Sequence, residues 1–120
     1  MGGCLMGDIQ VQIASTFKHE ANSLGKRYKS LKEDITELIE NLKDNPFLGK
    51  DLGGGVHKIR LAIKSKGHGK SGGARVITHT EIITEMTDGI VRFLSIYDKS
   101  EQSTISDKRI QQLLKEAGLK

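Results

Sequence analysis

Acidic residues are absent from a long internal stretch of this 120-residue chain, where no Asp or Glu falls between Asp51 and Glu81. The net charge is only +4, so the basic excess is concentrated in one region rather than spread over the chain. Such a concentration predicts a polyanionic partner, although solubility alone explains many mildly basic proteins. The basic residues of this stretch are Lys58, Arg60, Lys64, Lys66, Lys70 and Arg75.

Cysteine and aromatic residues are also scarce. The single cysteine, Cys4, excludes an internal disulfide and fits a reducing compartment. With no Trp, three Phe and two Tyr, the core must be mostly aliphatic. No apolar run is long enough to span a bilayer and no signal segment is recognisable, so we expect a cytoplasmic protein without a membrane partner.

The length and a hydrophobic content of 36% predict one domain, which we place at residues 9–120 after a disordered leader, residues 1–8. Residues 9–13 alternate as a strand, and two helices follow. The first is capped by Ser15 or Thr16, and the second begins at a Ser30–Glu33 capping box and ends at Pro46. The apolar stripes of these helices predict a helical hairpin that covers one side of a sheet.

The second half of the chain reads as three antiparallel strands and a helix. Residues 47–55 (FLGKDLGGG) form a turn-rich connection that we expect to be mobile. Strands are predicted near 57–64, 74–83 and 90–97, with a loop at 65–73 and a turn at 87–89. A last helix is capped by Ser106 and closed by Gly118. The predicted class is α+β, in the order β-α-α-β-β-β-α.

Alternation in the first of these strands separates apolar from basic side chains. A period of two places Ile59, Leu61 and Ile63 on one face of residues 56–64. The opposite face then carries Lys58, Arg60 and Lys64. Arginine binds phosphate through two parallel hydrogen bonds, so we interpret the basic face as a surface for the RNA backbone. For any single lysine, a solvated surface charge is the alternative.

The loop 65–73 resembles a phosphate-binding loop only in part. Gly69, Lys70 and Ser71 match the end of GxxxxGK[ST], but Lys64 stands where the first glycine is required. The loop also joins two strands, whereas that motif leads into a helix, so we exclude nucleotide hydrolysis. A flexible cationic loop that approaches a phosphate and a plain soluble loop are both compatible with these residues.

The histidines and the end of the last strand carry further candidates. His57, His68 and His79 lack metal-ligand spacing, so no metal site is expected. His68 either assists proton transfer or is an exposed loop residue without a role. Tyr97 and Lys99 are expected on one face at the rim of the sheet, together with Phe93 and Ser95. There Tyr97 is either an edge of the core or a group that stacks on a base or moves a proton.

Two segments resemble a known family. The segment containing KIRLAIKSKGHGKSGGARVI and the later FLSIYDKSEQSTIS are similar to the RelE/ParE superfamily of bacterial toxin–antitoxin toxins, in its RelE/HigB-like branch. The resemblance runs from about Ile9 to Ala117. It implies a RelE-like fold with an antiparallel twisted sheet, an N-terminal helical hairpin packed on one face and a C-terminal helix.

The resemblance also implies a function. A toxin of this kind cuts mRNA in the ribosomal A site by attack of the ribose 2′-hydroxyl on the adjacent phosphate, and a cognate antitoxin neutralises it. No metal or small-molecule cofactor is implied. A gyrase-directed toxin or an inactive homologue that only binds antitoxin is the alternative, because the family's C-terminal Tyr or His is missing here.

Residue roles follow from the same resemblance. Arg60 and Arg75 are implied to stabilise the phosphate, Lys58 to accept the hydroxyl proton and Lys99 to act as a second cation or proton donor. Tyr97 is implied to orient a base. The resemblance and the loop composition together suggest RNA contacts by Lys64, Lys66, His68 and Lys70.

Overall fold

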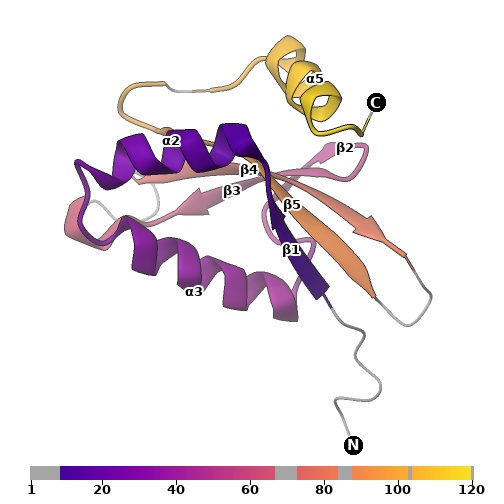
Figure 1. The fold of residues 1–120 in the computed structure, drawn as a ribbon, viewed down its shortest axis with the longest axis horizontal. Coiled ribbons are helices and arrows are strands. Elements are labelled where there is room, and N and C mark those ends of the chain that lie inside the picture. The colour runs from indigo at the N-terminus through magenta and orange to yellow at the C-terminus, as the bar shows by residue number, and fades with distance from the viewer. Residues whose placement is uncertain (1–8, 67–72, 84–87, 103, 120) are drawn as a thin grey trace, which may run out of the picture.

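The computed structural model describes residues 9–66, 73–83, 88–102 and 104–119, which form a five-stranded sheet with helices on both faces (Figure 1). The predicted leader, residues 1–8, lies outside the described residues. The helices are α2 (Ser15–Gly25), α3 (Leu31–Asp44) and α5 (Asp107–Glu116), with a 3-10 turn η1 (Lys64–Lys66). The sheet order is β1-β5-β4-β3-β2, and the strands are β1 (Ile9–Ile13), β2 (Lys50–Gly53), β3 (Val56–Leu61), β4 (Ala74–Ile82) and β5 (Gly89–Asp98).

Each face of the sheet has its own apolar cluster. The predicted helical hairpin, α2 and α3, packs on one face, where Phe17 and Leu38 meet Ile59 and Val76. Helix α5 packs on the opposite face, and Leu113 belongs to the cluster there. The α+β class and the helical hairpin on one face are therefore confirmed, and the two clusters hold the sheet rigid between them.

Two predictions about the sheet are wrong. Strand β1 pairs parallel to β5, so the sheet is mixed rather than antiparallel throughout. The connection predicted to be turn-rich and mobile contains strand β2, which pairs antiparallel with β3. Its three glycines form the tight turn between these strands, since Gly53, Gly54 and Gly55 have φ of 92°, 61° and 85°, values that glycine adopts readily.

The first basic strand is shorter than predicted, because its backbone turns toward α3. Strand β3 ends at Leu61, and Lys64 enters the 3-10 turn. There the Lys64 amide donates to Asp34 Oδ2 at 3.2 Å and the Ser65 amide donates to Ser30 Oγ at 2.8 Å. The capping-box prediction is wrong because the Ser30 side chain binds this turn instead of the helix end. The Ser30 hydroxyl makes no cap hydrogen bond and donates to Asp34 Oδ2 at 2.8 Å.

The predicted ends of the other helices are partly correct. Ala14, rather than Ser15 or Thr16, occupies the first cap position, without a side-chain hydrogen bond. The Ser106 cap is confirmed, because its hydroxyl accepts from the Arg109 amide at 3.1 Å. Helix α3 ends at Asp44, as the proline at position 46 predicts.

A β-bulge in β5 changes which side chains face which layer. Ile77 pairs with Ser95 while Thr78 pairs with Phe93, so Leu94 is an extra residue in the ladder. Phe93 therefore packs toward the helical hairpin, whereas Tyr97 packs toward α5. The prediction that Phe93 and Tyr97 share a face is wrong, because a strict period of two does not cross a bulge.

Glu20 of α2 supports this bulge, and its removal is expected to destabilise the fold. Its Oε1 accepts from Ser95 Oγ at 2.7 Å and from the Ile96 amide at 3.2 Å. Glu20→Ala leaves these donors without their partner, so the free energy of unfolding should fall by about 1–3 kcal/mol. Urea unfolding measures this loss. Glu40→Ala, an exposed glutamate on α3, should change stability by less than about 0.5 kcal/mol. Equal stability of the Glu20 variant and the wild type would show that the bulge needs no support.

Candidate nucleic-acid interface

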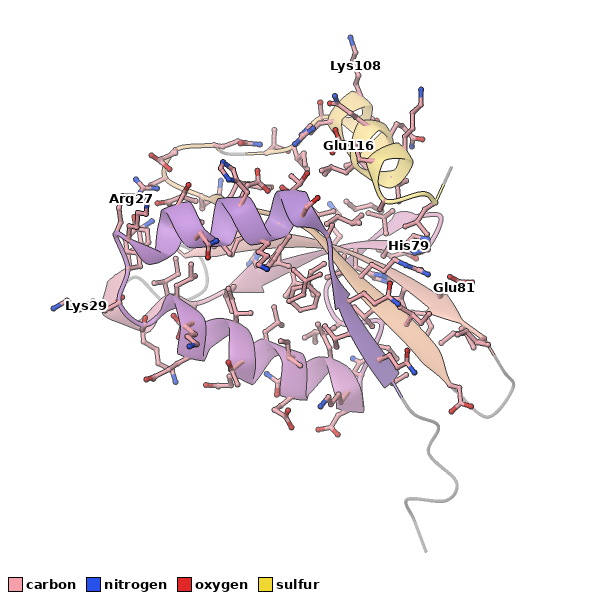
Figure 2. The ribbon with its side chains drawn as sticks, in the orientation of Figure 1. Arg27, Lys29, His79, Glu81, Lys108 and Glu116 are labelled. Atoms are coloured by element: carbon pink, nitrogen blue, oxygen red, sulfur yellow. The ribbon has the colours of Figure 1, made fainter. Side chains whose placement is uncertain are left out.

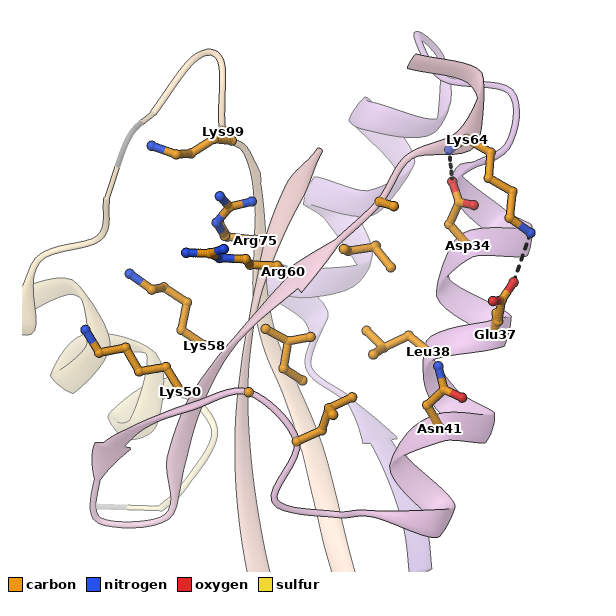
Figure 3. Close-up of a pocket in the computed structure, with 15 residues that line it drawn as sticks. Asp34, Glu37, Leu38, Asn41, Lys50, Lys58, Arg60, Lys64, Arg75 and Lys99 are labelled. Atoms are coloured by element: carbon orange, nitrogen blue, oxygen red, sulfur yellow. Dashed lines mark hydrogen bonds and ion pairs between the residues drawn. The ribbon is translucent and has the colours of Figure 1, made fainter. Parts of the chain in front are cut away.

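Five basic side chains project from the sheet into one space on the side opposite α3 (Figure 3). They come from four different strands or strand ends, and we call them the cationic face: Lys50, Lys58, Arg60, Arg75 and Lys99. The register places Lys50 beside Lys58 and Arg60 beside Arg75. Directly opposed residues of antiparallel strands have Cβ atoms about 4.5–5.5 Å apart. Lys58, Arg60 and Arg75 therefore lie on one face of the sheet.

Three members of the cationic face have no carboxylate partner among the described residues. Lys50, Lys58 and Arg60 belong to none of the ion pairs found among the described residues. Opposed like charges such as Arg60 and Arg75 destabilise a sheet slightly. A bound anion relieves that repulsion, so the arrangement favours a ligand that carries several negative oxygens.

A groove of about 610 Å³ connects the cationic face with α3. Strand β2 pairs only with Val56, His57 and Lys58, so it leaves the rest of that edge of β3 uncovered. The groove passes around this uncovered edge. One wall is the cationic face and the other is α3, which contributes Asp34 and Asn41. Its volume lies in the range of pockets that hold small molecules. The apolar lining between the walls comprises Leu38, Leu48, Ile59, Leu61 and Ala62.

Arg75 and Tyr97 lie deeper than the rest of the interface. Arg75 is 5% exposed and its Nη1 donates to the Ala74 carbonyl at 3.1 Å, whereas Arg60 is exposed. Tyr97 pairs with Arg75 across the strands and is 6% exposed beneath α5. Burial raises the pKa of Tyr97, and the charge of Arg75 acts in the opposite direction. A ring buried in this way does not offer its face to a nucleobase.

Two of the lysines predicted to contact RNA are paired with carboxylates. Lys64 Nζ lies 2.9 Å from Glu37 Oε2 on the α3 side of β3, so Lys64 does not share the cationic face with Lys58. The hydrogen bond to Glu37 raises the pKa of Lys64. Lys66 Nζ lies 2.6 Å from Asp98 Oδ1. The charge of the basic segment is therefore partly neutralised by groups distant in sequence.

Asp98 organises the end of β5 beside the interface. It is the last residue of β5 and is 2% exposed. Its carboxylate accepts from Lys66 Nζ and from the Tyr28 hydroxyl, both at 2.6 Å, and from Ser100 Oγ at 2.7 Å. Burial raises its pKa, but the hydrogen bonds from Lys66, Tyr28 and Ser100 outweigh burial and hold the pKa well below its usual range. Nearby, Arg27 donates two hydrogen bonds to the Glu101 carboxylate. Arg27 lies at the left end of the molecule in Figure 2.

The remaining candidates lie elsewhere or outside the described residues. His68 and Lys70 belong to 67–72, which are not described. His57 is buried against Phe47, and His79 is half-buried, with its pKa lowered mainly by burial. Within the described residues, no three His, Cys, Asp or Glu side chains are grouped so as to hold a metal ion. In that same part of the chain, no helix is long and apolar enough to cross a membrane.

Sequence reasoning missed the groove residues contributed by other segments. Lys50 was placed in a mobile connection, although three successive glycines followed by an alternating strand are also a hairpin signal. Asn41 lies on the same side of α3 as Leu38, and in the sequence it is only a polar residue at the border of the apolar stripe. Only the unpaired edge of β3 brings Asn41 into the same groove as the cationic face, and no local pattern predicts it.

Comparisons with known proteins agree with this architecture. Residues 10–119 match the family described as the RelE toxin of the RelE/RelB toxin–antitoxin system. Among solved structures, a mutant of the E. coli toxin RelE in the free state is similar, with a TM-score of 0.52 and 14% sequence identity. The match covers 80% of this chain and 88% of that one, and at this identity it supports the fold alone. No curated protein sequence matches the chain.

Proposed function

Since this chain belongs to the RelE toxin family of toxin–antitoxin systems, we propose that it inhibits translation by cutting mRNA at the cationic face. One observation carries the proposal: Lys50, Lys58 and Arg60 converge on a groove with the deeper Arg75, and the first three have no carboxylate partner among the described residues. Such a surface suits the phosphodiester backbone, whose charge dominates the affinity of proteins for nucleic acids.

The proposed reaction is a transesterification. The ribose 2′-oxygen attacks the neighbouring phosphorus, and the bond from phosphorus to the 5′-oxygen breaks, which leaves a cyclic phosphate and a 5′-hydroxyl. Negative charge grows on the phosphoryl oxygens in the transition state, and fixed cations aimed at those oxygens lower the barrier. Arg60, at the open rim, and Arg75, below it, are assigned this role because they lie directly opposite each other.

Proton transfers are assigned to the lysines. Lys58 Nζ is proposed to accept the proton of the 2′-hydroxyl, and Lys99 to deliver a proton to the leaving 5′-oxygen. Both residues line the groove, one on β3 and the other just beyond the end of β5. Tyr97 is proposed to position the Arg75 guanidinium rather than to touch RNA, because it is buried beside Arg75. The proposed partners are mRNA on the ribosome and a cognate antitoxin.

Mapping of RNA ends tests the proposal. The intact chain is expressed briefly in bacterial cells without antitoxin, and new 5′ ends in mRNA are sequenced. We expect growth arrest together with new ends inside coding regions, and both should disappear with an Arg60→Ala, Lys58→Ala double variant. Arrest with intact transcripts and DNA damage would instead indicate a gyrase-directed toxin. Normal growth with soluble, folded protein would indicate an inactive homologue, and either result contradicts the proposal.

A further inference from the structure

The wall of the groove formed by α3 has chemistry opposite to that of the cationic face. Asp34, Leu38 and Asn41 recur at helical spacing along the side of α3 that faces β3 (Figure 3). This wall combines hydrogen-bonding oxygens and an amide with an apolar surface, and it carries no basic side chain of its own. The two walls therefore suit different parts of one ligand.

Asp34 is an unusual group to find in such a wall. It is 3% exposed, and its Oδ2 accepts from Ser30 and from the Lys64 amide. Its Oδ1 is buried without a hydrogen-bond partner among the described residues. A buried acceptor normally has a partner, so this oxygen leaves an unsatisfied polar group just beneath the α3 wall. Asn41, two turns further along α3, is exposed and offers both a donor and an acceptor.

We propose that the α3 wall is a nucleobase subsite that favours adenine, with Asn41 as the residue that reads the base. This inference rests on the proposed function, because the phosphate of the same nucleotide occupies the cationic face. An amide side chain matches the adjacent donor and acceptor of adenine with two hydrogen bonds. The apolar lining, including Leu48 and Ala62, receives the flat ring, as apolar side chains do in enzymes that hold an unstacked base.

The edge of β3 makes this arrangement possible. From Ile59 to Leu61, β3 pairs with β4 along one edge, and no described strand pairs with its other edge, so the groove is continuous from the cationic face to α3. A nucleotide carries its phosphate and its base on different sides of the sugar. A single-stranded RNA that crosses this edge therefore presents a phosphate to the cationic face and a base to the α3 wall. The pair between Glu37 and Lys64, 2.9 Å long, borders the base side and leaves Asn41 open. An extended peptide is the competing occupant, but it does not account for the five cations of the other wall.

The distribution of cut sites tests the subsite. New 5′ ends are mapped for the wild type, Asn41→Ala, Asn41→Gln and the control Glu40→Ala, whose site is exposed on α3 and outside the groove. In the wild type, adenine should be enriched at one fixed position beside the cut. Asn41→Ala should reduce that enrichment about fivefold or more, since one bidentate contact discriminates between bases by at least that factor. Glutamine, which makes the same contact, should retain the enrichment.

Each other outcome has a definite meaning. An unchanged distribution of cut sites for Asn41→Ala overturns the subsite while the nuclease proposal stands. Loss of all cutting in that variant, with its fold intact, also overturns it, because a specificity residue alters the choice of site rather than the chemistry. A variant that cuts as the wild type does but resists the antitoxin would assign the α3 wall to a protein partner. If the wild type produces no new ends, the proposed function itself fails.

Discussion

Arg60→Ala is expected to lower the rate of RNA cleavage about 100-fold, because removal of one preorganised donor to a developing negative charge typically has an effect of that size. Arg60 is exposed on β3, and its side chain takes part in no ion pair or hydrogen bond with the described residues, so the fold should survive the change. The rate is measured with purified protein on mRNA in translating ribosomes, as the yield of new 5′ ends over time. Arg60→Lys should recover only part of the rate, because lysine cannot bind phosphate in the bidentate manner.

A matched charge deletion separates catalysis from general attraction to RNA. Lys18 is exposed on α2, which packs on the face of the sheet opposite the cationic face. Lys18→Ala removes the same charge and should leave the rate within about twofold of the wild type, since a distant charge is largely screened at physiological salt. Equal losses for Lys18→Ala and Arg60→Ala would contradict a localised site and would point to diffuse electrostatic binding.

Asp98→Asn is expected to lower the free energy of unfolding by about 3 kcal/mol or more, the usual effect of breaking a buried ion pair from one side. Lys66 is 11% exposed at its side chain and would keep its charge without the carboxylate that lies 2.6 Å away. Urea unfolding at neutral pH measures the loss. Glu101→Gln is the control, because its pair with Arg27 is exposed and an exposed ion pair contributes little to stability.

The same carboxylate predicts how stability depends on pH. The pKa of Asp98 is held below its usual range in the folded protein, whereas in the unfolded chain it is about 3.9. Its contribution is therefore complete above the unfolded pKa and is lost as the pH falls through the lower folded pKa. The decrease in the free energy of unfolding from pH 6 to pH 3 should be larger for the wild type than for Asp98→Asn. Parallel curves for the two proteins would show that Asp98 does not dominate acid unfolding.

Patterns of neighbouring residues correctly predicted the elements that depend on short-range features of the sequence. The stripe that includes Leu31, Leu38 and Leu42 marked α3, and the Ser106 cap marked the start of α5. Alternation at Lys58 and Arg60 also placed these two side chains correctly on the face opposite Ile59. These features depend on residues within one or two turns of each other, so they are visible in a single sequence.

What the sequence did not predict depends on contacts between distant segments. Lys64 was assigned to the basic face, but Asp34 and Ser30 of the helical hairpin bind the backbone there and end the strand. Tyr97 was assigned to the face of Phe93, and the bulge at Leu94 moved it beneath α5. In each case a tertiary hydrogen bond or an extra residue overrides the local period, and neither has a signature in the chain.

The central claim is that the cationic face binds an RNA phosphate, and NMR mapping tests it most directly. The chain with ¹⁵N-labelled arginine side chains is titrated with a short single-stranded RNA whose 2′-hydroxyls are methylated, so that no nucleophile for cleavage is present. We expect the largest shifts of Nε–H signals at Arg60 and Arg75, and smaller ones at Arg27 and Arg109. Shifts confined to Arg27 or Arg109, with Arg60 and Arg75 unchanged at saturation, would contradict it.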